Sequence, residues 1–455
     1  MLAVAGCGGT ETAATTAEGA ASIAPESAAL YASINTDLDS GQVNQLEELL
    51  AKFPDREKLL DEIQSDLAAD DVSWENDIKP ALGKALDIVL LDLQSRDAVY
   101  LLKPADKAKL EALVDKADPP GVSREIEGWT AVAEKEAVLD RFEQARSEGS
   151  LEDDPGFQAA VDGLPEDALA RLYVNGAAAT EAAEKAGGSA GSGTRVKAFA
   201  AALGAESTGL RLDGALQTEL ADDLAGIAPY EPKLLEAAPD DAFVFLSGNG
   251  YGQVAKSIRD FPGIVEQLRS ALGLDAGELA GLLEGEFALW VAPGLPVPEV
   301  TFLAEAKDEQ RSLRVLDRLV GRLAMSGDAE RRTTEVDGVQ AKQVVMDGVA
   351  ITYAAFDGRV IVTTRPGAIA DVRGGGDNLA DDSTFKEASE DAKLGETTFG
   401  FLYLDLARIT PLIEGFDIGG VPPEVTRNLE PLGAFMLQAG GEAEDLKLSA
   451  FLSIE

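Results

Sequence analysis

The sequence predicts an α+β protein, a tandem duplication of a mostly antiparallel curved sheet covered by amphipathic helices. Segments typical of strands are interrupted by helical segments without the regular alternation of a doubly wound parallel sheet. The same ordered series of segments also occurs twice in the 455 residues, which indicates an internal repeat. We expect two similar units, each with helices on one face of its sheet, placed side by side or about a pseudo-twofold axis.

Short landmarks recur in the same order in both copies. An Ala-Pro-x-x-Ala sequence opens the first copy at 24–28 and the second at 238–242. Each opening leads into a series of short apolar segments that are typical of strands. The paired segments are 30–34 and 243–246, 86–93 and 287–291, 99–102 and 301–304, 172–175 and 402–405, and 210–216 and 446–452. The repeats are therefore predicted at 25–232 and 233–455.

One hairpin distinguishes the second copy from the first. Asp-Gly occurs three times between residues 337 and 358, and Asp-Gly favours the positive φ angles of two-residue hairpin turns. The intervening segments 339–346 and 349–356 have the composition of strands. We expect a β-meander here, with an extra hairpin near 339–356 that the first copy lacks.

Helical periodicity is clear in both copies. Leu46, Leu49 and Phe53 recur at spacings of three and four, as do Leu313, Leu316 and Val320, so each set lies on one side of an amphipathic helix. Leucine and isoleucine at 59–67 continue the first pattern, and Gly-Gly-Ser-Ala-Gly-Ser-Gly at 187–193 reads as a mobile loop.

The composition excludes several classes of function. The 39 basic and 81 acidic side chains give a formal net charge of −42, whereas nucleic-acid binding needs clustered Lys and Arg. The chain has no histidine and one cysteine, so histidine triads, histidine zinc sites and internal disulfides are impossible. Apolar residues at 45% still allow a substantial core.

The single cysteine lies where a bacterial lipoprotein needs it. Val4-Ala5-Gly6-Cys7 resembles a lipobox, and residues 8–24 are nearly all small or polar. We expect Cys7 to carry a lipid and residues 1–24 to form a signal remnant and flexible tether, which places the body on the outer face of the cytoplasmic membrane. Only six residues precede Cys7, so we expect the true start codon upstream.

These landmarks together resemble the bacterial domain-of-unknown-function family 3352. The resemblance rests on the lipobox, the two Ala-Pro-x-x-Ala openings, the Leu-x-Asp-Asp-x-x-Phe segments and the tyrosine-containing strands that follow them. It covers nearly all of residues 24–455. It implies a lipoprotein or membrane-anchored protein of the cell envelope, and it adds no catalytic residue because the family has no established activity.

Candidate chemical groups are better explained as structural elements. Asp153-Asp154 and Asp381-Asp382 suit calcium or acid-base chemistry, but an Asp before a helix start is typical of an N-cap. Gly248 to Gly252 lacks the remaining positions of a phosphate-binding loop. The three tryptophans, Trp74, Trp129 and Trp290, lie beside apolar stretches and indicate core packing. We therefore assign no catalytic, cofactor-binding or metal-binding residue.

Two classes of function remain, with an unrecognised enzyme as a third. The first is a non-enzymatic envelope protein that binds another protein, whose partner should offer a basic surface because the chain is so acidic. The second is a carrier that encloses a lipid or another hydrophobic ligand. A cavity of about 300 Å³ or more lined by Leu, Val and Phe favours the carrier, whereas an exposed apolar patch over a filled core favours the interaction module.

Overall fold

A computed structural model describes most of the chain beyond residue 18. The described residues are 19–58, 61, 65, 72–95, 97–185, 195–219, 228–252, 276–295, 297–323, 329–346, 348–415 and 422–455. Cys7, the first part of the tether, most of 59–67 and the glycine-rich segment 187–193 lie outside them. In this described part, no helix is both long enough and apolar enough to cross a membrane.

The strands belong to an 18-stranded sheet in which every pairing is antiparallel. The strands are β1 (Leu30–Asn35), β2 (Ala85–Leu90), β3 (Ala98–Leu102), β4 (Val122–Ile126), β5 (Trp129–Ala133), β6 (Ala170–Asn175), β7 (Arg195–Glu206), β8 (Gly209–Glu219), β9 (Val244–Asn249), β10 (Glu286–Ala292), β11 (Glu299–Glu305), β12 (Glu330–Val336), β13 (Val339–Met346), β14 (Val349–Phe356), β15 (Arg359–Thr363), β16 (Gly400–Asp405), β17 (Leu432–Glu442) and β18 (Asp445–Ile454).

Helices connect these strands. The α-helices are α1 (Gly41–Leu50), α3 (Lys79–Ala81), α4 (Lys107–Lys116), α5 (Glu136–Arg146), α6 (Pro155–Val161), α7 (Gly176–Lys185), α10 (Ala276–Leu282), α11 (Glu309–Leu323), α12 (Ala368–Gly374), α13 (Ser383–Asp391), α14 (Leu406–Gly415) and α15 (Pro423–Leu429). Shorter helical turns include η1 (Ala20–Ser22), η2 (Trp74–Ile78), η3 (Leu151–Asp153), η4 (Lys233–Ala237) and η7 (Leu379–Asp381).

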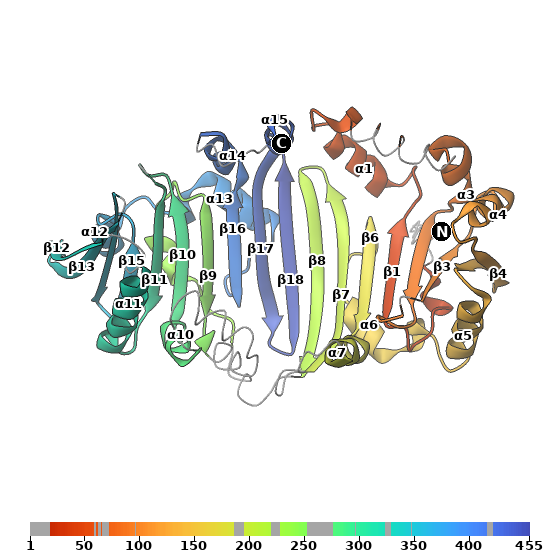
Figure 1. The fold of residues 1–455 in the computed structure, drawn as a ribbon, viewed down its shortest axis with the longest axis horizontal. Helices are drawn as coiled ribbons and strands as arrows, with labels where there is room; N and C mark the ends of the chain where they lie inside the picture. Colours follow the sequence, from red (N-terminus) through yellow and green to blue (C-terminus); the bar gives the residue numbers. More distant parts are fainter. Residues whose placement is uncertain are drawn as a thin grey trace, which may run out of the picture.

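The strands lie side by side along the long axis of the molecule (Figure 1). From one edge to the other, the pairings give the order β4-β5-β3-β2-β1-β6-β7-β8-β18-β17-β16-β9-β10-β11-β15-β14-β13-β12. Strands β1 to β8 occupy one half of the sheet and β9 to β18 occupy the other. The α+β class is confirmed, but the strands form one sheet rather than a separate sheet for each predicted repeat.

The two halves meet where β8 pairs with β18. In this pairing Asp213 lies opposite Ser449, and Ser449 Oγ donates a hydrogen bond to Asp213 Oδ1 at 3.1 Å. The hairpins β7–β8 and β17–β18 lie on opposite sides of this pair, because β8 pairs with β7 and β18 pairs with β17 along their other edges. The contact joins two strands that are far apart in the sequence into one continuous ladder.

One face of the sheet, here called the packed face, carries the two largest apolar clusters. Tyr31 and Val89 belong to the cluster under α5 and α6, whereas Phe245 and Trp290 belong to the cluster under α12 and α13. Residues directly opposite one another in an antiparallel pair share a face, and Tyr31 lies opposite Val89 as Phe245 lies opposite Trp290. Each half therefore has its own core on this face.

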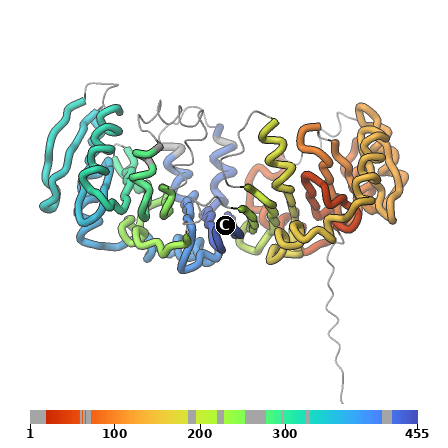
Figure 2. Tube along the Cα trace, turned by 90° about the horizontal axis from the view of Figure 1, so that it is seen from below, coloured from red at the N-terminus to blue at the C-terminus, as the bar shows by residue number. Residues whose placement is uncertain are grey.

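The other face, here called the open face, carries smaller clusters under separate helices. Leu110 of α4 packs near Leu102 at one end of the sheet, and Leu316 of α11 packs near Tyr353 at the other. Leu49 of α1 packs beside the ends of β7 and β18. Figure 2, which looks along the strands, shows helical segments on both sides of the sheet. The expectation of helices on one face only is wrong, because these strands carry apolar side chains on both faces.

The turns and the meander match the sequence prediction. Strands β13 and β14 cover the predicted segments, and β12 to β15 form a meander of neighbouring strands. Asp337 and Asp357 have φ angles of 49°, and Gly338, Gly348 and Gly358 also have positive φ, as two-residue hairpin turns require. Asp347 lies outside the described residues.

Residues 20–24 correct the predicted extent of the tether. They form η1 and the turn after it, and Ala20, Ile23 and Ala24 are buried in the first-half core. Small side chains permit this close packing, since a Cβ at the preceding Gly19 would lie 2.7 Å from Tyr31 Oη. The tether therefore ends before residue 20, and the chain enters the body through the packed face.

Candidate functional site

A continuous line of apolar side chains crosses the open face from end to end. It follows directly from the strand register, because each member lies opposite the next in an antiparallel pair. We call it the apolar row. Its members, from β3 to β15, are Leu102, Leu86, Ile34, Ala170, Leu203, Leu212, Ala450, Leu437, Leu402, Leu246, Leu289, Phe302 and Val362.

The middle of the apolar row is incompletely covered. Its ends pack in the clusters of α4 and α11, but the stretch from Ile34 to Leu289 belongs to none of the core clusters of the described residues. Within that stretch Ile34 is 37% exposed, Leu212 44%, Leu437 37% and Leu246 40%. At the usual strand spacing this stretch is about 40 Å long. Scattered exposed apolar residues need no explanation, but a continuous line indicates a contact surface.

The local sequence explains why the apolar row exists. In β16, Phe401 and Tyr403 are buried in the packed-face core, and the alternate residues Leu402 and Leu404 point to the open face. A strand with one solvent-exposed face normally alternates apolar with polar residues. Here both sets are apolar, so both faces require a covering partner.

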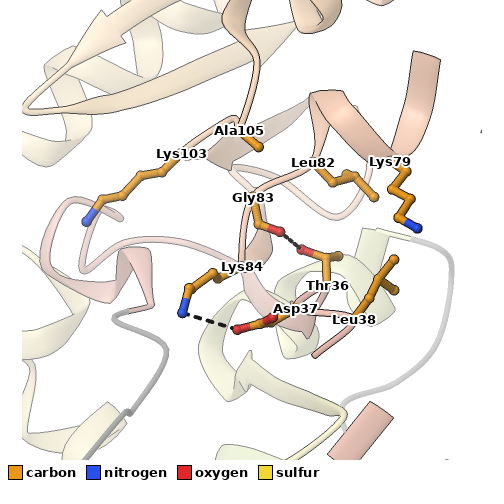
Figure 3. Close-up of a pocket in the computed structure, with 9 residues that line it drawn as sticks. All are labelled: Thr36, Asp37, Leu38, Lys79, Leu82, Gly83, Lys84, Lys103 and Ala105. Atoms are coloured by element: carbon orange, nitrogen blue, oxygen red, sulfur yellow. Dashed lines mark hydrogen bonds and ion pairs between the residues drawn. The ribbon is translucent and has the colours of Figure 1, made fainter. Parts of the chain in front are cut away.

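A surface depression of about 310 Å³ lies beside one part of the apolar row. Its lining includes Thr36, which follows β1, and Lys79, Lys84 and Lys103. Figure 3 shows that the three ammonium groups do not converge: Lys84 is directed to Asp37, 3.3 Å away, and Lys79 and Lys103 extend away from it and from each other. The geometry therefore does not assemble a cradle for an anion.

A second, smaller depression of about 100 Å³ lies between α10 and α11. Its lining includes Glu278, Glu284, Lys307, Asp308 and Arg311, so side chains of both charges line it. The larger depression reaches the volume that the carrier hypothesis requires, but its lining mixes Leu38 and Leu82 with lysines and an aspartate and includes no Phe.

A buried polar pair lies on the packed face of the first half. Asp87 on β2 is fully buried, and Tyr31 Oη on β1 donates a 2.6 Å hydrogen bond to its Oδ1. Burial raises the pKa of the Asp87 carboxyl, and the hydrogen bond from Tyr31 partly opposes that shift. Burial, followed by the negative charge of Asp87, raises the pKa of Tyr31 well above its ordinary value. The two side chains therefore form a hydrogen-bonded pair inside the first-half core.

The second half buries a different carboxyl group. Glu286 opens β10, and its Oε1 accepts a 2.7 Å hydrogen bond from the backbone N–H of Leu234 in η4. Burial, assisted by the nearby charge of Glu305, raises the pKa of Glu286 to about 7. This carboxyl group fastens η4 to the sheet and titrates near neutral pH.

The paired aspartates are helix caps, as predicted. Asp154 Oδ1 accepts from Gly156 N–H at the start of α6, and Asp382 Oδ1 accepts from Phe385 N–H at the start of α13. Asp382 Oδ2 also accepts from Arg408 Nη2 at 2.9 Å. These contacts satisfy helix N-termini and leave the carboxylates without the arrangement of a catalytic pair.

The other residues singled out from the sequence serve the fold. Trp129 and Trp290 are buried in the packed-face clusters, and Trp74 is half-buried in η2. Tyr251, within the glycine-rich segment after β9, donates to the Phe399 carbonyl and packs against the Phe287 ring. Among the described residues, no group of three or more His, Cys, Asp or Glu is placed to hold a metal ion.

A family model matches residues 108–453, which is most of the chain. Its description is protein of unknown function (DUF3352). The chain belongs to this family. The suspected membership is therefore confirmed, and no curated protein matches the chain.

Solved structures show only remote likeness to this DUF3352 chain. Crystal form IV of TP0453 is 13% identical with a TM-score of 0.28, and the match covers 50% of this chain and 82% of that one. Crystal form III is 12% identical with a TM-score of 0.27, covering 50% and 80%. At these TM-scores the likeness supports no argument on fold or function.

The apolar row and the two buried carboxyl groups were not predicted from the sequence. Leu212, Leu437 and Leu246 lie far apart in the DUF3352 sequence, and only the pairing of β8, β18, β17, β16 and β9 aligns them. The one available signal was alternation of apolar residues on both faces, as in Phe401-Leu402-Tyr403-Leu404. Asp87 and Glu286 carry no sequence mark that separates them from the many exposed acids.

Proposed function

We propose that this chain is a non-enzymatic envelope protein that binds a partner through the uncovered stretch of the apolar row. The observation that carries the proposal is the unbroken line of apolar side chains on the open face, with Leu212, Leu437 and Leu246 partly exposed along it. Covering apolar surface of this kind with a partner removes it from water, which favours binding.

The shape of the surface favours an interaction module over a carrier. A carrier encloses most of its hydrophobic ligand in a cavity with apolar walls. The larger depression mixes Leu38 and Leu82 with Lys79, Lys84 and Asp37, the smaller one is lined in part by Glu278 and Arg311, and neither encloses a ligand within apolar walls. The apolar side chains instead lie on an extended face, which suits the side of another protein.

We further propose that the protein is held on the outer face of the cytoplasmic membrane by a lipid on Cys7. The lipobox-like sequence Val4-Ala5-Gly6-Cys7 and membership in the family support this assignment. The described chain begins at Gly19, on the packed face beside Tyr31. The twelve-residue connection from Cys7 reaches at most about 40 Å, so the open face can point away from the membrane.

We infer that the two halves arose by tandem duplication of one unit. The support is the strand order: β5-β3-β2-β1-β6-β7-β8 in the first half has the same connectivity as β15-β11-β10-β9-β16-β17-β18 in the second. Under this equivalence β4 corresponds to β14. The additional hairpin of the second half is then β12–β13, at the edge of the sheet, rather than 339–356.

The anchor is tested on protein recovered from its own membranes. Intact mass spectrometry should show a diacylglycerol-modified cysteine at position 7, and Cys7→Ala should move the protein from the membrane fraction to the soluble fraction. An unmodified protein in the cytosol would refute the proposed location without bearing on the binding face.

The binding face is tested by photo-cross-linking in intact cells. A cross-linking amino acid at Leu212 or Leu246 should give a discrete protein adduct, whereas the same group at Leu295, which is 95% exposed in the loop before β11, should not. Adducts with the mass of a lipid at Leu212 would favour the carrier, and equal adducts at all three positions would refute the assigned face.

A further inference from the structure

The open face already accepts amphipathic helices at several places. Leu46 and Leu49 of α1 pack beside Leu210 and Leu452 next to the apolar row. Leu316 and Val320 of α11 and Leu110 of α4 pack in the clusters at its two ends. In each case apolar side chains spaced by three or four residues meet the sheet, as the amphipathic pattern requires. Helices of the chain itself therefore show that this face packs against the apolar side of an amphipathic helix.

The stretch between these helices has the dimensions of another helix. From Ile34 to Leu289 it crosses adjacent strands for about 40 Å, which is the length of a helix of about 25 residues. None of the described helices places a clustered apolar side chain on it. A hydrocarbon chain would remain open to water on this extended surface, since it lacks enclosing walls.

The negative charge around the stretch favours a positively charged partner. Glu47 and Glu48 are exposed on α1, whose Leu46 and Leu49 pack beside the apolar row. The whole chain carries a formal charge of −42. A second copy of this chain or an anionic lipid surface would meet like charge, whereas basic side chains flanking an apolar stripe would meet opposite charge.

We propose that the uncovered stretch of the apolar row binds a basic amphipathic helix supplied by a partner protein. The inference rests on the proposed function and names the partner's chemistry: leucine-like side chains at spacings of three and four, flanked by Lys or Arg. The helix lies across the strands between α4 and α11, with its apolar stripe on Leu212, Leu437 and Leu246 and a basic flank towards Glu47 and Glu48 of α1.

The test uses the purified full chain and three synthetic 25-residue peptides. One has leucines at helical spacing with lysine elsewhere, the second replaces lysine by glutamate, and the third scrambles the leucine and lysine order. Fluorescence anisotropy should detect binding of the first peptide only. Raising salt from 0.1 to 0.5 M should weaken that binding severalfold, because the flanking contacts are electrostatic.

Matched variants decide whether the apolar row is the site. Leu212→Gln combined with Leu437→Gln should weaken binding at least tenfold, since apolar contacts at the centre of an interface carry most of its affinity. Leu295→Gln, which changes a more exposed leucine off the apolar row, should leave affinity within twofold. Leu246→Gln is a second test variant, and circular dichroism checks that each protein is folded.

Several results would overturn the proposal. Equal binding by the double variant and the wild type would mean that charge alone attracts the peptide. Equal binding of the scrambled peptide would remove the helical requirement. Row-dependent binding to neutral phosphatidylcholine vesicles, without binding to the peptide, would assign the face to a lipid surface. An unacylated Cys7 would refute the location and leave the helix-binding inference standing.

Discussion

The two halves of the sheet solve the same packing problem with different chemistry. On β1 and β2 the first half places Tyr31 opposite Val89 and Ser33 opposite Asp87. At the corresponding register positions of β9 and β10, the second half places Phe245 opposite Trp290 and Ser247 opposite Ala288. Phe245 and Ala288 of the second half therefore stand at the positions that Tyr31 and Asp87 occupy in the first.

This difference shows which features the scaffold does not require. Both solutions fill the space under the covering helices, and both leave no charged group of the pair exposed. A hydrogen-bonded polar pair and an apolar pair can be nearly equivalent in stability, because replacing both partners removes the desolvation cost together with the hydrogen bond. Neither polarity nor volume is therefore fixed at these positions, since Val89 in the first half corresponds to the much larger Trp290 in the second.

The largest expected effect comes from Trp290, whose indole fills the second-half core. Trp290→Ala should lower the free energy of unfolding by about 3 to 5 kcal/mol, since it leaves a large cavity. Val89→Ala at the matching position should cost about 2 kcal/mol, because fewer buried carbons are lost. Urea unfolding measures both. Equal losses would contradict the expectation that the larger buried side chain contributes more to the stability of its core.

The second expected effect is a pH dependence that Glu286 adds in the second half. The pKa of Glu286 is about 7 in the folded chain, whereas an unfolded glutamate titrates near pH 4.3. The folded state therefore binds this proton more tightly, and the resulting stabilisation, at most about 4 kcal/mol, is complete below about pH 4.3 and lost as pH rises through 7.

Glu286→Gln provides the comparison for that prediction. Urea unfolding between pH 4 and 8 should show that the free energy of unfolding falls less steeply with rising pH in the variant than in the wild type. The first half has Ala85 at this position, so Ala85→Ser is a control that should keep the wild-type slope. Identical slopes for Glu286→Gln and the wild type would contradict the raised pKa.

The third prediction concerns variants that replace Tyr31 and Asp87 by the Phe and Ala found at the corresponding positions of the second half. Tyr31→Phe leaves the Asp87 carboxyl without its tyrosine donor and should cost about 1 to 3 kcal/mol, and Asp87→Ala should cost a similar amount. The double variant should be more stable than the sum of the two losses predicts, by at least about 1 kcal/mol. Strictly additive losses in urea unfolding at pH 7 would show that the two side chains are independent.

The smallest expected effects are the losses of stability on removing the helix caps Asp154 and Asp382. Asp154→Ala removes one capping hydrogen bond from α6 and should cost about 1 kcal/mol. Asp382→Ala should cost more, about 2 kcal/mol, since it also removes one of the hydrogen-bond acceptors of Arg408. Thermal unfolding ranks the two variants, with Asp381→Ala as a control that leaves the α13 cap in place. The reverse order would mean that the Arg408 contact adds no stability.

Several elements were predictable because their signals are local. The strands β1, β11, β13, β14 and β18 lie within a few residues of the predicted segments, and the Asp-Gly turns have the expected positive φ angles. The caps at Asp154 and Asp382 followed from an acidic residue before a helix. In each case neighbouring residues determine the conformation, so the evidence lies within one short window.

Strand β7 was not predictable in the same way. Residues Arg195–Glu206 are rich in alanine, which favours helix and has low strand propensity. They form a strand because β6 and β8 supply ladder hydrogen bonds on both sides, while small side chains allow close packing against both faces. Tertiary context therefore overrides local propensity at the centre of the sheet.

The amino-acid sequence alone determined the acidity, the absence of histidine chemistry, the positions of most strands and turns, and the family resemblance that the family match confirms. Only the tertiary structure decided that the two halves share one sheet through β8 and β18 and that distant leucines align across it. The physical reason is that strand pairing uses backbone groups common to all residues, so a partner remote in the chain leaves no mark in either local sequence.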